Sequence, residues 1–101
     1  MTRDLAFLGF EWDTGNWPKC AKHGLSKEHV ESVFRTDPFI VPSQITSDET
    51  RYAVIGPTES GRRAFIAFTL RMHDGVVLIR PVSARYMHAK EIEFYDSIKS
   101  A

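Results

Sequence analysis

The sequence predicts a small α+β domain, in which an antiparallel β-sheet is packed against N-terminal helices and a C-terminal helix. The chain has 101 residues, of which 43% are hydrophobic, and this suits one domain over residues 1–101 with a single core. Apolar residues recur at helical spacing between residues 26 and 37. From residue 39 to residue 83 they alternate with a period of two, as β-strands require.

A strand and a short helix are expected first. Residues 5–12 are rich in aromatic side chains, which favours a β-strand. A short helix should then run to about His23, because Pro18 is tolerated in a first helical turn. Gly24 stands where a left-handed residue ends such a helix.

A second helix should begin after Ser26, the expected N-cap, and end at the Asp37-Pro38 pair. Its apolar face is formed by Val30, Val33 and Phe34, which lie three and four residues apart. This helix can therefore bury one side against a sheet.

Three or four antiparallel strands should follow, with a polar loop over residues 42–50 between the first two segments. In the third strand every second residue from Ala64 to Met72 is apolar, and the intervening residues belong to the other face. Asp74-Gly75 is a strong signal for a hairpin turn, since both residues tolerate positive φ. The predicted strands are 39–41, 51–56, 62–72 and 76–83.

A C-terminal helix should open near His88, because Glu91 stands where a side chain reaches back to the start of a helix. Ile92 and Tyr95 continue this helix at helical spacing. We expect the helices at both ends of the chain to cover the apolar face of the sheet.

Composition excludes several classes of protein. Thirteen basic residues balance thirteen acidic ones, so neither disorder nor a uniformly basic coat is expected. No run approaches the ~18 consecutive apolar residues of a membrane span, and the start lacks the pattern of a signal peptide. The single cysteine, Cys20, fits a reducing compartment, so a cytoplasmic location is expected.

The charge is unevenly distributed along the chain. Residues 62–90 hold six basic residues and one acidic residue, Asp74. A locally basic surface on a neutral protein attracts phosphate groups. An arginine-rich, half-solvated sheet face explains the same pattern without any ligand, so both interpretations stay open.

A metal site or a cofactor is not expected. The four histidines lie far apart, and the sequence contains neither a Cys-x-x-Cys nor a His-Glu-x-x-His pattern. Cys20 and His23 provide half of a zinc site or a nucleophilic pair at most.

A histidine and several arginines remain as candidates for chemistry. Imidazole suits proton transfer near neutral pH, and guanidinium binds phosphate through two parallel hydrogen bonds. Cleavage of RNA through its own 2′-hydroxyl needs a base, an acid and cations around the scissile phosphate. A His23 that only caps its helix and arginines that are only surface charges explain the same residues.

Several short motifs occur in one consistent order over about residues 9–96, and together they resemble BrnT-type toxins. The motifs are Phe10-Glu11-Trp12-Asp13, Lys22-His23-Gly24, Val33-Phe34, Glu49-Thr50-Arg51-Tyr52, Ile55-Gly56, Gly61-Arg62, Phe68-Thr69-Leu70-Arg71, Ile79-Arg80-Pro81-Val82-Ser83-Ala84-Arg85, Glu91 and Tyr95.

The resemblance implies a RelE-like fold and a ribonuclease toxin of a type II toxin–antitoxin system. It also implies a cognate DNA-binding, BrnA-like antitoxin encoded beside the toxin, with promoter DNA bound only by the hetero-oligomer. Phe65 is the apolar residue that we expect to help anchor this partner.

The resulting hypothesis is a metal-independent endoribonuclease that cuts mRNA, without cofactor or membrane, and arrests translation. Either His23 or Glu91 serves as the base, and the sequence does not choose between them. The alternative is a non-catalytic RNA- or protein-binding module of the same fold. The candidate catalytic residues are His23, Arg71, Arg85 and Glu91, and the candidate RNA-binding residues are Lys22, Arg62, Arg80 and Tyr95.

Overall fold

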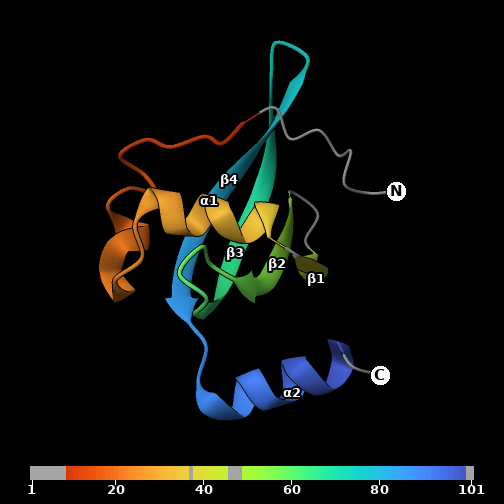
Figure 1. Ribbon diagram of the computed structural model, residues 1–101. Coiled ribbons are helices and arrows are strands. Elements are labelled where there is room, and N and C mark those ends of the chain that lie inside the picture. The colour runs from red at the N-terminus through yellow and green to blue at the C-terminus, as the bar shows by residue number, and fades with distance from the viewer. Residues whose placement is uncertain (1–8, 37, 46–48, 100–101) are drawn as a thin grey trace.

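The computed structural model describes residues 9–36, 38–45 and 49–99, and its α+β architecture confirms the predicted fold class (Figure 1). A four-stranded antiparallel sheet has the strand order β1-β2-β3-β4. Among the described residues, no helix is both long and apolar enough to cross a membrane. The elements are the 3₁₀ helix η2 (Lys19–His23), α1 (Lys27–Arg35), β1 (Phe39–Ile45), β2 (Thr50–Pro57), β3 (Arg63–His73), β4 (Val76–Tyr86) and α2 (Ala89–Lys99).

The predicted N-terminal strand is reduced, in its described part, to one parallel bridge between Phe10 and Ile79 of β4. Residues 5–8 of that prediction lie outside the described residues. The amide of the buried Asn16 then bridges the N-terminal segment and β4, because its Nδ2 donates to the carbonyl of Glu11 (2.9 Å) and to that of Pro81 in β4 (2.8 Å). A side chain therefore replaces the strand that the aromatic run predicts.

The two helices predicted before residue 37 are confirmed. Gly24 ends η2 in the left-handed conformation (φ 94°), where a Cβ would be strained. The Ser26 hydroxyl accepts a hydrogen bond from the backbone N–H of His29 (3.0 Å) and so caps α1. Residue 37, part of the predicted stop signal, lies outside the described residues.

The predicted polar loop over residues 42–50 is wrong at its first positions. β1 continues to Ile45, with a register shift between Pro42 and Gln44. Proline is compatible with an edge strand because one side of such a strand forms no ladder hydrogen bonds. Residues 46–48 of the predicted loop lie outside the described residues.

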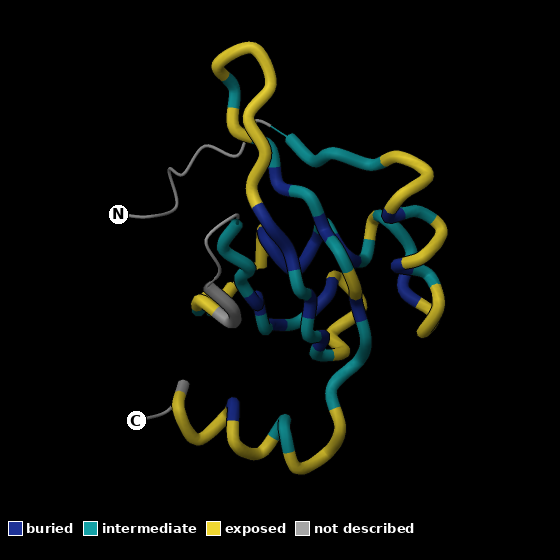
Figure 2. The backbone as a smooth tube through the Cα atoms, turned by 180° about the vertical axis from the view of Figure 1, so that it is seen from behind, coloured by how far each residue is buried: buried dark blue, intermediate teal, exposed yellow. Residues whose placement is uncertain are grey.

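The hairpin of β3 and β4 turns at Asp74 and Gly75 as predicted, and both have positive φ (51° and 80°). It extends beyond the helices, as its exposed tip in Figure 2 shows. Leu70 and Met72 therefore keep the predicted alternation but remain 40% and 69% exposed.

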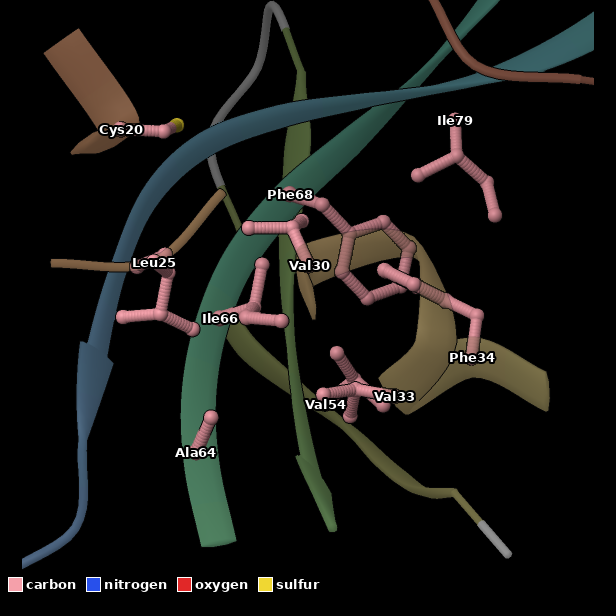
Figure 3. Close-up of a cluster of buried hydrophobic side chains, with 11 residues drawn as sticks. Cys20, Leu25, Val30, Val33, Phe34, Val54, Ala64, Ile66, Phe68 and Ile79 are labelled. Carbon is pink, nitrogen blue, oxygen red and sulfur yellow. The ribbon is translucent and has the colours of Figure 1, made fainter. Parts of the chain in front are cut away.

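One face of the sheet, which we call the core face, packs against η2 and α1 (Figure 3). Cross-strand partners Val54 and Ile66 lie at its centre and are fully buried. The cluster consists of Cys20, Leu25, Val30, Val33, Phe34, Val54, Ala64, Ile66, Phe68, Ile79 and Ala84.

Helix α2 packs against the opposite face, so the prediction that all helices cover one face is wrong for α2. The Tyr95 ring lies 6.4 Å from the ring of Phe39. Phe39 pairs with Ile55, and Ile55 with Phe65, in a row whose side chains alternate with those of Val54 and Ile66. Because this row is also apolar, the sheet has a second surface for a helix to cover.

Candidate functional site

A β-bulge places three candidate arginines on one face of the sheet. Arg80 and Arg85 are five residues apart, and in a regular strand an odd separation would put them on opposite faces. Val82 has no partner, because Ala67 pairs with Ser83 and the next residue of β3 pairs with Pro81.

With this shift, Arg85 is opposite Phe65 and Arg80 is opposite Thr69, two positions that share a face of β3 with Arg71. We call this surface, opposite to the core face, the arginine face. Arg71, Arg80 and Arg85 therefore belong to one surface of the sheet.

Arg80 is held by two carboxylates of the N-terminal segment. Its Nη1 donates to Glu11 Oε1 and to Asp13 Oδ2, both at 2.9 Å, and its Nη2 donates to Asp13 Oδ1 at 3.1 Å. The Glu11 carboxylate also contacts the imidazole of His73. Only 15% of the Arg80 side chain is exposed, so its guanidinium is largely committed to these partners.

The pKa values of both acids reflect this arrangement. A hydrogen bond from Arg80 lowers the pKa of Asp13, assisted by the N–H of Gly15. Desolvation would raise the pKa of Glu11, but hydrogen bonds from His73 and Arg80 outweigh it and lower that pKa. A Cβ on Gly15 would lie 2.8 Å from Arg80 Nη2, so glycine permits this close approach.

Arg85 is held differently, by one carboxylate from α2. Its Nη1 and Nη2 donate to Glu91 Oε1 (2.8 Å) and Oε2 (2.9 Å) as a two-pronged pair, and its Cζ lies 4.8 Å from the centre of the Phe65 ring. Glu91 also accepts from the backbone N–H of His88 (2.8 Å), which confirms the predicted cap of α2. Chiefly through the hydrogen bonds from Arg85, the pKa of Glu91 falls to about 2.

The third arginine, Arg71, lies near the end of the hairpin. Its guanidinium is 3.7 Å from the Glu49 carboxylate, which also lies 3.6 Å from Arg51. Nearly half of the Arg71 side chain is exposed, and a polar pocket of about 400 Å³ adjoins it. Arg71 is therefore the most accessible of the three guanidinium groups.

Small side chains separate the Arg80 and Arg85 ends of the arginine face. Ala53 pairs with Ala67, and Ala67 pairs with Ser83, so a row of short side chains crosses three strands. Ser83 is exposed and Ala67 is half-buried, whereas Ala53 is only 2% exposed, so this row is accessible at its β4 end.

The structure divides the predicted site residues between two sides of the sheet. Glu91 is brought next to Arg85, whereas Lys22 and His23 lie exposed on η2, which packs on the core side. Within the part of the chain that the structure describes, no hydrogen bond, ion pair or ring contact joins His23 to an arginine of the arginine face.

Two other predicted RNA contacts lie in aromatic environments. The Arg62 guanidinium lies 3.5 Å from the centre of the Tyr86 ring, and Tyr86 packs against the core cluster. Arg62 therefore belongs to the core side. Tyr95 is only 5% exposed, and its ring faces Phe39 beneath α2.

Sequence reasoning missed His73, Glu11 and Asp13 as members of the arginine cluster. His73 lies just beyond the predicted strand 62–72, although it shares strand parity with Arg71. That parity was a usable signal. No local signal links Glu11 or Asp13 to an arginine more than 60 residues away.

Cys20 belongs to the hydrophobic core. It is fully buried, and burial raises the pKa of its thiol, so a thiolate nucleophile is disfavoured. Across residues 9–36, 38–45 and 49–99, no group of three or more His, Cys, Asp or Glu side chains is placed to hold a metal ion.

Comparison with known proteins assigns the family. A family model described as a ribonuclease toxin, BrnT, of type II toxin–antitoxin systems matches residues 12–91, which include Arg71, Arg80, Arg85 and Glu91. No curated protein sequence matches this chain. The match covers most of the chain, and the chain belongs to the BrnT family of ribonuclease toxins of type II toxin–antitoxin systems.

Proposed function

We propose that this chain is a metal-independent endoribonuclease that cleaves mRNA and thereby arrests translation. Its family membership supports a ribonuclease toxin. The observation that carries the proposal is the bulge at Val82, which puts Arg71, Arg80 and Arg85 on one face of the sheet. We also propose that residues 1–101 form one domain of the RelE-like type; a cytoplasmic location remains a prediction of the sequence.

Phosphate recognition is assigned to the arginine face. In the free protein, the Glu91 carboxylate occupies both nitrogens of the Arg85 fork. A phosphate group accepts the same pair of parallel hydrogen bonds from guanidinium. The scissile phosphate therefore takes the place of Glu91 on Arg85, and Arg71 contacts a neighbouring phosphate. Arg80 remains paired with Glu11 and Asp13 and supports the site by holding the N-terminal segment against the sheet.

The proposed reaction is an attack of the ribose 2′-oxygen on the adjacent phosphorus. The O2′–P bond forms and the P–O5′ bond breaks, which leaves a 2′,3′-cyclic phosphate and a 5′-hydroxyl end. The displaced Glu91 carboxylate accepts the 2′ proton, and the departing 5′-oxygen takes a proton from water. Arginine supplies the charge stabilisation that a metal would otherwise provide.

Glu91 is preferred over His23 as the base because Glu91 lies beside Arg85. Paired with Arg85, its pKa of about 2 makes it a weak base, so its displacement by phosphate is part of the proposal. Lys22, His23 and Arg62 are assigned to contacts with more distant RNA, and Tyr95 contributes by holding α2.

A BrnA-like, DNA-binding antitoxin is proposed as the partner, since type II systems use a protein antitoxin. Promoter DNA is then bound by the complex rather than by this chain alone.

A non-catalytic RNA-binding module is the second candidate. The observation in its favour is that Glu91, the acid beside Arg85, is strongly acidified and therefore a poor base in the free protein. Both candidates bind RNA in a salt-dependent way, but only the ribonuclease produces new RNA ends.

The test uses purified protein and a labelled RNA in excess chelator. Cyclic-phosphate ends and a loss of cleavage in Glu91→Gln, with Glu93→Gln as the matched control on the same helix, are expected. Activity that requires a divalent ion contradicts the metal-free mechanism. Slow cleavage in His23→Gln, with Glu91→Gln unaffected, transfers the role of base to His23.

A further inference from the structure

An open apolar pocket lies between α2 and the arginine face. Its volume is about 350 Å³, and the sheet contributes Phe39, Ile55 and Phe65 to its wall. Helix α2 contributes Phe94 and Ile98. The helix therefore covers this end of the sheet without filling the space beneath it.

The α2 side of this pocket continues onto the protein surface. Phe94 is 67% exposed and Ile98 is 38% exposed, although both are large apolar side chains. Phe94 and Ile98 are four residues apart, so they form one ridge along the helix. Lys90 lies one helical turn before Phe94 on the same side. Exposed apolar residues that adjoin an apolar pocket are typical of a protein interface.

One end of this ridge is positively charged. The charges of Arg85 and Glu91 cancel in their ion pair. Lys90 is exposed, and no ion pair involving it is found in the described part of the chain. The pocket is therefore apolar along its length and positive at the end nearest Arg85.

We propose that this surface, formed by the pocket and by Lys90, Phe94 and Ile98, is where the protein antitoxin docks. The occupant is a segment with a large apolar side chain that enters the pocket and an acidic residue that pairs with Lys90. This inference deepens the proposed function, because it locates the partner on the toxin.

Two features favour a protein occupant over RNA. The wall is aromatic and aliphatic, whereas RNA requires phosphate contacts, which the arginines beyond the pocket provide. The pocket also borders the Arg85–Glu91 pair, since Glu91 lines it. A segment bound there covers Arg85 and keeps Glu91 in place, which explains inhibition by steric exclusion of the phosphate.

The test is co-purification of this chain with the product of its neighbouring gene, expressed together from the native operon. Phe94→Asp should weaken the complex at least about tenfold, because a charge in an apolar anchor position is desolvated on binding. Ile98→Asp provides a second variant, and Lys90→Glu should weaken the complex less and mainly at low salt. The matched control is Met72→Asp, a 69% exposed apolar residue on the hairpin, which should bind normally.

Cleavage of RNA by each free variant separates this proposal from the proposed function. Normal cleavage with lost partner binding supports the docking site. Loss of partner binding with no cleavage by any protein, the parent included, leaves the docking site standing and contradicts the ribonuclease.

Three results overturn the docking site. The first is parent-like binding by both Phe94→Asp and Ile98→Asp. The second is an equal loss in Met72→Asp. The third is a concentration-dependent dimer of the free chain that Phe94→Asp abolishes, which assigns the surface to a second copy instead.

Discussion

Arg80 and Arg85 lie on the same face of the sheet, but they are held by different parts of the molecule. Arg80 is 15% exposed and donates three hydrogen bonds to Glu11 and Asp13 of the N-terminal segment. Arg85 is 36% exposed and donates its strong hydrogen bonds to one residue of α2, Glu91. One guanidinium ties a segment to the sheet, whereas the other binds a group that can be exchanged.

Position on the arginine face alone therefore does not fix the role of an arginine. The role depends on the free energy needed to release the carboxylate that the arginine binds in the free protein. If Arg80 released its acids, the Glu11 carboxylate, which is 16% exposed, would lose one of its hydrogen-bond donors. Release of Glu91 from Arg85 exposes a carboxylate that is already one-third accessible to water.

The largest expected effect is on cleavage by Arg85→Ala. Loss of one preorganised donor to a developing anion lowers the rate by about 10²–10³-fold. Rates of RNA cleavage, and growth after expression without the antitoxin, measure the effect. Arg35→Ala, an exposed arginine on α1, is the control and should cleave like the parent. A folded Arg85→Ala protein that remains fully toxic removes Arg85 from the mechanism.

The second-largest expected effect is a loss of folding stability in Arg80→Ala. Arg80→Ala should lower the free energy of unfolding by about 1–3 kcal/mol, because the Glu11 carboxylate, which is 16% exposed, loses a hydrogen-bond donor. Urea denaturation measures this change. Arg85→Ala should change stability less, since its partner is more exposed. Equal losses in the two variants would show that both arginines are structural.

A third effect is the acid dependence of stability. The folded-state pKa of Glu91 is about 2, below the ordinary value of 4.5, because Arg85 and the His88 N–H bind the ionised form. The resulting stabilisation is present above pH 4.5 and is lost as the pH falls toward 2. In Glu91→Gln, the free energy of unfolding from denaturation curves should therefore fall less between pH 4.5 and pH 2 than in the parent. Glu93→Gln should show the same fall as the parent.

The smallest effect on stability is expected for Arg71→Ala. Its contact with Glu49 is 3.7 Å long and exposed, so the free energy of unfolding should change by less than about 0.5 kcal/mol. RNA binding should weaken. In a plot of the logarithm of the RNA-binding constant against the logarithm of the salt concentration, the magnitude of the slope should fall by about one. Fluorescence titration at several salt concentrations tests this, and an unchanged slope contradicts a phosphate contact.

Local sequence determined the ends of the elements and the hairpin turn. Gly24, Ser26 and Glu91 were correctly predicted to end or begin helices, because a cap is formed by residues within a few positions of each other. Asp74-Gly75 fixed its turn for the same reason. The α+β class followed from the change of hydrophobic period near residue 39.

Tertiary structure alone decided which side chains meet. The register around Val82 puts Arg80 and Arg85 on one face, and pairing across strands sets that register. Contacts over 62 and 69 positions in the sequence join Glu11 to His73 and Arg80. These pairings depend on the packing of the whole sheet. A local pattern could therefore supply the arginines but could not say which would share a face, or that α2 would lie against it.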